Sequence, residues 1–185
     1  MLVEEQMKMY NKDTEIFIYF DKNATYIPSL LEFPRLKFLD ISFNKLKSLP
    51  DIPDTVNDLS FQSNLLPYFP KVPPNLLYLN VRDNKITYIY ANMLPKTLIY
   101  FNCSHNLLVS LPDLSEYSGL KELNCDNNLL NDLPKLPSNL EILCCQNNKL
   151  SKLLELPNSL IMFNSHYNDI SCQQSFTKAE FWKLN

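Results

Sequence analysis

Five cysteines and two histidines are the residues of this chain that could carry nucleophilic or metal chemistry. Cys144 falls on the outward side of a predicted strand, and His166 lies close to the next one, so they could form a thiolate–imidazole pair. No pattern for an oxyanion hole accompanies that pair. The cysteine nucleophile therefore remains a minor hypothesis, and we expect no catalytic residue and no enzymatic activity.

Cys103, Cys125 and Cys145 occupy one shared position of a sequence repeat. Stacked strands would bring their Cα atoms to about 5 Å, which is within disulfide range. Parallel side chains and the lack of a secretory signal instead favour reduced thiols, which behave as small apolar core residues. The chain has no Cys-x-x-Cys pair, and a dry core column is a poor zinc site, so we expect no metal and no cofactor.

Composition argues against several classes of function. The 185 residues include 1 glycine and 13 prolines, which excludes glycine-rich phosphate loops. A net charge of −3 argues against nucleic acid as a partner, and also against an anionic membrane surface. No run of 18 apolar residues predicts a membrane span. The first ten residues, MLVEEQMKMY, lack an apolar signal core, so we expect an intracellular protein, cytoplasmic or in a host cytoplasm.

The elements that position these residues follow from self-similarity. Residues 120–140 fit the template L-x-x-L-x-L-x-x-N-x-L, and the template's asparagine recurs every 20 or 22 residues. The recurring asparagines are Asn44, Asn64, Asn84, Asn106, Asn128, Asn148 and Asn168. This period predicts an α/β solenoid of leucine-rich repeats, a right-handed superhelix with a parallel β-sheet on its concave side. We expect the asparagine amides to form a structural ladder, each bonding the backbone of its own and the adjacent coil.

We expect a single domain, residues 1–185. Residues 1–15 form an N-terminal cap with a short helix, residues 16–170 form about eight repeats, and residues 171–185 form a C-terminal cap with a second short helix. Such caps are needed because an end coil would otherwise expose its apolar core.

The first repeat is degenerate. We align it on Asn23, which makes Ile18 and Phe20 its inward residues and predicts a strand from Ile16 to Phe20. In the later repeats, prolines follow the asparagine or precede the next coil. Because proline disfavours a helix interior, we expect extended, polyproline-II-like returns on the convex side. Tyr117 replaces one of these prolines and predicts a looser return around it.

The outward positions of the strands supply the candidate binding surface. Tyr78, Tyr100 and Arg82 cluster in the middle of this face, and tyrosine and arginine are enriched at binding hot spots. The predicted partner-binding residues are Phe38, Phe43, Tyr78, Arg82, Tyr100, His105, Glu122, Asp126, Gln146 and His166. Two other interpretations stay open: aromatic rings that merely cover the sheet, and a solvated ladder of polar residues whose amides bond one another.

Several strings of the chain resemble the short leucine-rich repeats of bacterial effectors of the YopM and IpaH type. They are LPKLPSNLEIL (133–143), FPKVPPNLLYL (69–79) and SLPDIPDTVNDL (48–59). Similar repeats occur in amoebal and giant-virus proteins. The resemblance indicates the fold, and it does not imply the ubiquitin-ligase activity of IpaH-type effectors. A rigid array of variable outward positions with no catalytic motif leads us to expect a protein-binding module. Two alternatives to a binding module are an effector-like scaffold acting on host proteins and a structural or assembly protein that self-associates.

Overall fold

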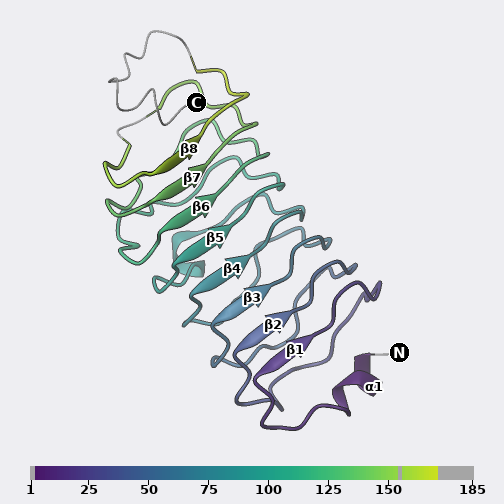
Figure 1. The fold of residues 1–185 in the computed structure, drawn as a ribbon. Helices are drawn as coiled ribbons and strands as arrows, with labels where there is room; N and C mark the ends of the chain where they lie inside the picture. The colour runs from purple at the N-terminus through teal and green to yellow at the C-terminus, as the bar shows by residue number, and fades with distance from the viewer. Residues whose placement is uncertain (1–2, 154–155, 171–185) are drawn as a thin grey trace.

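The computed structural model describes residues 3–153 and 156–170. Within them the chain winds into a solenoid whose strands form one eight-stranded parallel sheet, ordered β1 to β8 as in the sequence (Figure 1). The strands are β1 (Ile16–Ile18), β2 (Phe38–Asp40), β3 (Asp58–Ser60), β4 (Tyr78–Asn80), β5 (Tyr100–Asn102), β6 (Glu122–Asn124), β7 (Ile142–Cys144) and β8 (Met162–Asn164). The predicted leucine-rich-repeat architecture is confirmed. The predicted C-terminal cap lies outside the described residues.

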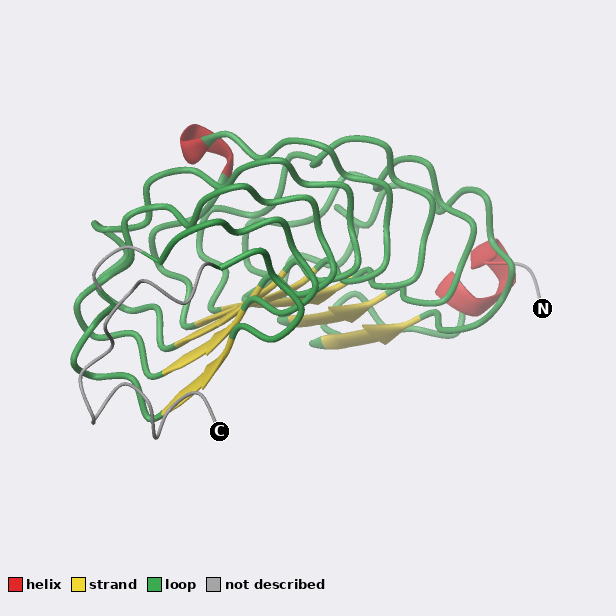
Figure 2. Ribbon diagram, turned by 90° about the horizontal axis from the view of Figure 1, so that it is seen from above, coloured by secondary structure: helices red, strands yellow, loops and turns green. Residues whose placement is uncertain are grey.

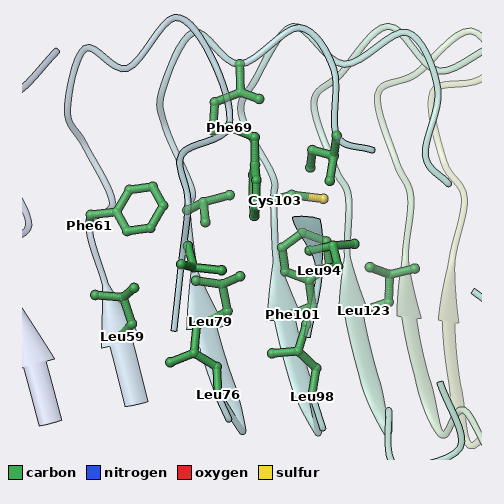
Figure 3. Packing of buried hydrophobic residues seen from close by; sticks show 14 of the residues in the cluster. Leu59, Phe61, Phe69, Leu76, Leu79, Leu94, Leu98, Phe101, Cys103 and Leu123 are labelled. Atoms are coloured by element: carbon green, nitrogen blue, oxygen red, sulfur yellow. The ribbon is translucent and has the colours of Figure 1, made fainter. Parts of the chain in front are cut away.

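Each strand has only three residues, and its central side chain points into the core. The central residues Leu59, Leu79 and Phe101 pair in register and are fully buried. Two residues further on, a second stripe that includes Phe61 and Cys103 is also fully buried. Figure 3 shows these side chains packed between the sheet and the returns. The period-2 alternation of a strand thus becomes continuous apolar stripes running through the solenoid.

The predicted alignment of the first repeat is wrong by one residue. Phe17, not Ile18, pairs with Leu39 and is fully buried, whereas Ile18 and Phe20 are 44% and 43% exposed. Lys22 therefore occupies the position that asparagine holds in later coils. A slip of one residue moves every side chain to the opposite face of a strand, and the nearby Asn23 was a misleading anchor. The strand is also shorter than predicted, ending at Ile18.

The recurring asparagines hydrogen-bond the backbone of two coils. The Asn106 Nδ2 group donates to the carbonyls of Val81, Cys103 and Ser104, and its Oδ1 accepts from the Ile86 backbone N–H. Six of the seven asparagines are buried, and all seven bridge their own coil to the preceding one in this way. Each amide thereby fixes the corner where the chain leaves the strand.

The returns lie on the outer side of the arc, opposite the strands (Figure 2). Among the described residues they contain one short helix, the 3-10 helix η1 (Ala91–Met93), and tight turns such as the one closed by Val56 N–H and the Pro53 carbonyl. Tyr117 takes a proline's place and is buried. Its hydroxyl donates to the carbonyls of Ala91 and Leu94, so this return is well packed.

A short helix lies at the N-terminal end of the solenoid. Helix α1 (Val3–Met7) buries Val3 and Met7 against the first coil. The Gln6 side chain donates to the Ile18 carbonyl at 2.6 Å, which partly satisfies the open edge of β1. In the described part of the chain, no helix is long and apolar enough to cross a membrane.

Candidate functional site

Most strands end on a polar residue that lies on the outward face of the sheet. The Oδ1 atoms of Asn80, Asn102, Asn124 and Asn164 each accept the backbone N–H two residues further on. Two of these amides also donate to a glutamine of the preceding coil, Asn80 to Gln62 and Asn164 to Gln146. These four amides thus hold the exits of their own strands. Two of them bond a glutamine amide, but none bonds another asparagine of this column.

Asp126 has a structural task on this face. Cys144 replaces the asparagine of its strand, and a thiol offers no comparable acceptor. The Asp126 carboxylate fills that place, because it accepts the Gln146 backbone N–H at 2.8 Å and the Gln146 amide at 3.3 Å. Asp126 is only 7% exposed, and burial raises its pKa. Asp126 therefore supports Gln146. The sequence analysis had placed it among the partner-binding residues.

Cys144 is a poor nucleophile. Burial, together with the nearby carboxylates of Asp126 and Glu122, raises its pKa to about 11. The thiolate fraction at neutral pH is then on the order of one in ten thousand. His166 is exposed, and no hydrogen bond joins it to Cys144 in the described chain. This environment argues against the thiolate–imidazole hypothesis.

The core cysteines are equally inert. Cys103, Cys125 and Cys145 are free and fully buried, and burial raises the pKa of each thiol. The Cys125 thiol donates to the Cys144 carbonyl at 3.4 Å. Within residues 3–153 and 156–170, no group of three histidine, cysteine or acidic side chains could hold a metal ion.

A hollow of about 260 Å³ opens in the middle of the sheet face, between β3, β4 and β5. Tyr78 and Tyr100 stand side by side in its wall, because they pair in register on adjacent strands, and Asp58 borders it on the next strand. Tyr78 is 44% exposed. The Tyr100 hydroxyl accepts a hydrogen bond from the Asn102 amide, and burial raises the pKa of Tyr100. Sequence reasoning found both tyrosines but missed Asp58, whose only signal was its place in their row.

The other predicted residues surround this hollow or lie apart from it. Arg82 is exposed, and its charge acts on Tyr100 and Asp126. Glu122 follows Tyr100 in the same row of the sheet. His105 is exposed at the strand exit, where its Nε2 atom lies 3.2 Å from the Asn127 amide. Gln146 and His166 lie further toward β8. The predicted set is therefore spread along the face and not gathered at one point.

Phe38 and Phe43 belong to the N-terminal end of the face. Phe43 lies against Phe20, with ring centroids 4.9 Å apart, and Ile18 is exposed nearby on β1. Met9, Ile18 and Phe20 help to line a hollow of about 590 Å³ beside the N-terminal cap. This apolar patch escaped the sequence analysis because the register error placed Ile18 and Phe20 in the core.

A third hollow lies on the returns. It has a volume of about 540 Å³ and is formed by the proline-rich segments that follow Asn44 and Asn64. Tyr68 in its wall is 75% exposed. The two sides of the solenoid thus both carry exposed tyrosines. On the returns Tyr68 shares its hollow with Asp51 and Asp54, whereas on the sheet face Tyr78 and Tyr100 lie in strand register with carboxylates on both sides.

No family model and no curated protein matches the sequence. Solved structures do match. YopM of Yersinia pestis, a leucine-rich effector protein, superposes with a TM-score of 0.79 at 34% identity, over 86% of this chain and 44% of that one. YopM of Yersinia enterocolitica superposes with a TM-score of 0.68 at 36% identity, over 73% of this chain and 29% of that one. A Shigella effector leucine-rich-repeat domain superposes with a TM-score of 0.71 at 28% identity, over 92% of this chain and 75% of that one.

The chain spans less than half the length of either YopM structure. Its repeat pattern, its parallel sheet and its asparagine ladder nevertheless extend across the described residues, as do the matches to these structures. The chain is a leucine-rich-repeat protein with short repeats similar to those of bacterial effectors.

Proposed function

We propose that the chain is a non-catalytic recognition module that binds another protein through the sheet face, centred on Tyr78 and Tyr100. The observation that carries this proposal is the hollow between β3 and β5, where two tyrosines on a rigid sheet border half-buried polar groups. Tyrosine offers a large contact area at a low cost in conformational entropy, and such anchors dominate binding energy. The inert thiols favour binding over covalent chemistry.

The rigidity of the scaffold supports this function. Each coil contacts only its neighbours, and the asparagine ladder fixes every strand exit, so the outward side chains form a preorganised array. A partner would therefore bind without a large ordering cost in the solenoid itself. The reduced state of the buried thiols fits an intracellular site of action, which we also propose.

The test is a comparison of two triple variants in affinity capture from a host or native lysate. Y78A/R82A/Y100A removes the centre of the sheet face. Y68A/Y88A/Y90A removes three exposed tyrosines from the returns and serves as the matched control. We expect a captured partner to lose at least tenfold in affinity with the first variant and to bind the second normally. Unchanged binding of the sheet-face variant would refute the proposal.

Two alternatives rest on specific observations. An effector-like scaffold acting on host proteins is suggested by the similarity to YopM and to the Shigella effector domain. Self-association is suggested by the apolar patch of Ile18, Phe20 and Phe43 at the end of the sheet. Light scattering at several protein concentrations tests the second alternative, because a dimer through this patch would dissociate on dilution and in a Phe20→Ser variant.

A further inference from the structure

One row of outward side chains has an unusual order across four strands. Register pairing places Asp58, Tyr78, Tyr100 and Glu122 next to one another on β3, β4, β5 and β6. The row therefore reads acid, tyrosine, tyrosine, acid. Neighbouring strands lie about 4.8 Å apart, so the two carboxylates are separated by about 14 Å, with both rings between them.

Neither carboxylate of this row has a hydrogen-bond donor or a cation as its partner within the described chain. Asp58 and Glu122 accept no side-chain hydrogen bond and take part in none of the four ion pairs, although both are half-buried. Burial and the nearby Asp40 raise the pKa of Asp58, as expected for a carboxylate that lacks a cation. A partly buried and unpaired carboxylate beside aromatic rings is a favourable environment for an incoming cation.

The wider face has the same bias. Its outward positions on β2 to β8 and two residues beyond each strand carry four carboxylates, Asp40, Asp58, Glu122 and Asp126, but one guanidinium, that of Arg82. Arg82 acts on Tyr100 and Asp126, whereas none of the interactions that shift the pKa of Asp58 comes from a cation. The sheet face is therefore electrostatically complementary to a basic partner.

We propose that this row binds an extended basic segment of a partner protein, with one arginine or lysine at Asp58 and a second at Glu122. This inference rests on the proposed function and adds the chemistry of its partner. The first cation would enter the hollow beside Asp58 and lie over a tyrosine ring, in a cation–π contact. An extended chain advances about 3.4 Å per residue, so basic residues four positions apart match the 14 Å separation.

The test uses two synthetic peptides of five residues. One has arginine at both ends and serine between, and the other replaces both arginines by citrulline, which keeps the shape and removes the charge. Titration at millimolar concentrations is followed through the backbone amide signals of the protein. We expect the arginine peptide to shift signals of β3 to β6 and to bind at least about fivefold more tightly than the citrulline peptide. Equal binding of the two peptides, or no shift, would overturn the inference.

A pair of charge variants locates the site. D58N/E122Q should weaken the arginine peptide about fivefold or more, and 0.5 M salt should weaken it in the wild type. The control E32Q/D54N removes the same charge from two exposed positions in the returns and should leave binding within twofold. An equal loss of affinity in both variants would mean non-specific attraction and would refute binding at this row. If a captured partner loses affinity with Y78A/R82A/Y100A but not with D58N/E122Q, this inference fails while the proposed function stands.

Discussion

The solenoid contains two columns rich in asparagine, and they differ in how many backbone groups each side chain bonds. The ladder asparagines are nearly all buried, and Asn106 makes four hydrogen bonds to backbone groups of two coils. At the strand ends, Asn124 accepts a single backbone N–H. The ladder is consequently invariant across seven coils, whereas aspartate, serine and cysteine also occur at the strand ends. Sequence variation therefore occurs at the strand ends, where fewer backbone groups depend on the side chain.

The largest expected effect comes from the ladder. Asn106→Ala leaves the buried Ile86 N–H and Val81 carbonyl without a partner, and we expect it to lower the free energy of unfolding by about 3 kcal/mol. Asn124→Ala should cost about 1 kcal/mol, because it removes one partly exposed bond. Urea denaturation measures both.

Asn75→Ala is the control, since Asn75 is exposed in a return and should change stability by less than about 0.5 kcal/mol. Equal losses for Asn106→Ala and Asn124→Ala would remove the distinction between the two columns.

The second prediction concerns the strand end that lacks asparagine. Asp126→Ala should cost about 1–2 kcal/mol, because the Gln146 N–H loses its acceptor. In a Cys144→Asn background the new amide can accept that N–H, as its counterparts do in other coils. The cost of Asp126→Ala should then fall by about 1 kcal/mol in a double-mutant cycle. Strictly additive losses would show that Asp126 does not replace the missing asparagine.

A smaller gain is expected at the corner that precedes each ladder position. This residue has a positive φ in every described coil, and two coils place an aromatic residue there: Phe43 at 56° and Tyr167 at 58°. Asparagine adopts this conformation with less strain, so Tyr167→Asn should stabilise the protein by about 0.5–1 kcal/mol.

Phe43→Asn makes the matched comparison. It should gain less than Tyr167→Asn, because Phe43 also contacts Phe20. Thermal unfolding of both variants tests this order, and a loss of stability in Tyr167→Asn would contradict the strain argument.

The smallest effect depends on pH. Because the pKa of Asp58 is raised on folding, its ionised form opposes folding above that pKa, and its stabilising contribution is complete only below its ordinary value of 3.8. Asp58→Asn should therefore be more stable than the wild type at pH 7 by less than about 1 kcal/mol, after solvent screening. The difference should shrink as pH falls through the raised pKa of Asp58 and should be gone below 3.8.

Asp113→Asn is a control of opposite sign. Hydrogen bonds from Ser115 lower the Asp113 pKa, so its carboxylate stabilises the fold at neutral pH and loses that contribution as pH falls through the lowered value. The same trend with pH in both variants would contradict these assignments.

The sequence predicted the solenoid well because its signal is repeated. Seven asparagines spaced 20 or 22 residues apart set the register of seven coils, and the buried stripes follow from that register. The first coil lacked this anchor, and there a choice between Lys22 and Asn23 inverted the face of Ile18 and Phe20. The predicted register of a coil was therefore correct where the coil carried the recurring asparagine, and wrong in the first coil, which lacks it.

The binding face was less predictable, because exposure at a given position depends on neighbours in adjacent coils. Tyr78 and Tyr100 could be placed side by side from spacing alone. The burial of Asp126 could not, since it follows from the absence of an asparagine one coil later. Asp58 was passed over because its unpaired state is visible only once the surrounding side chains are in place.

The most direct test of the central claim is a footprint of a bound partner on the solenoid, obtained by NMR cross-saturation from the partner to the backbone amides of this chain. We predict that saturation is strongest on β3 to β6, at Ser60, Tyr78 and Tyr100, and absent from the return around Tyr68. A footprint centred on the proline-rich returns, or on Phe20 and Phe43 at the N-terminal end, would contradict recognition through the middle of the sheet.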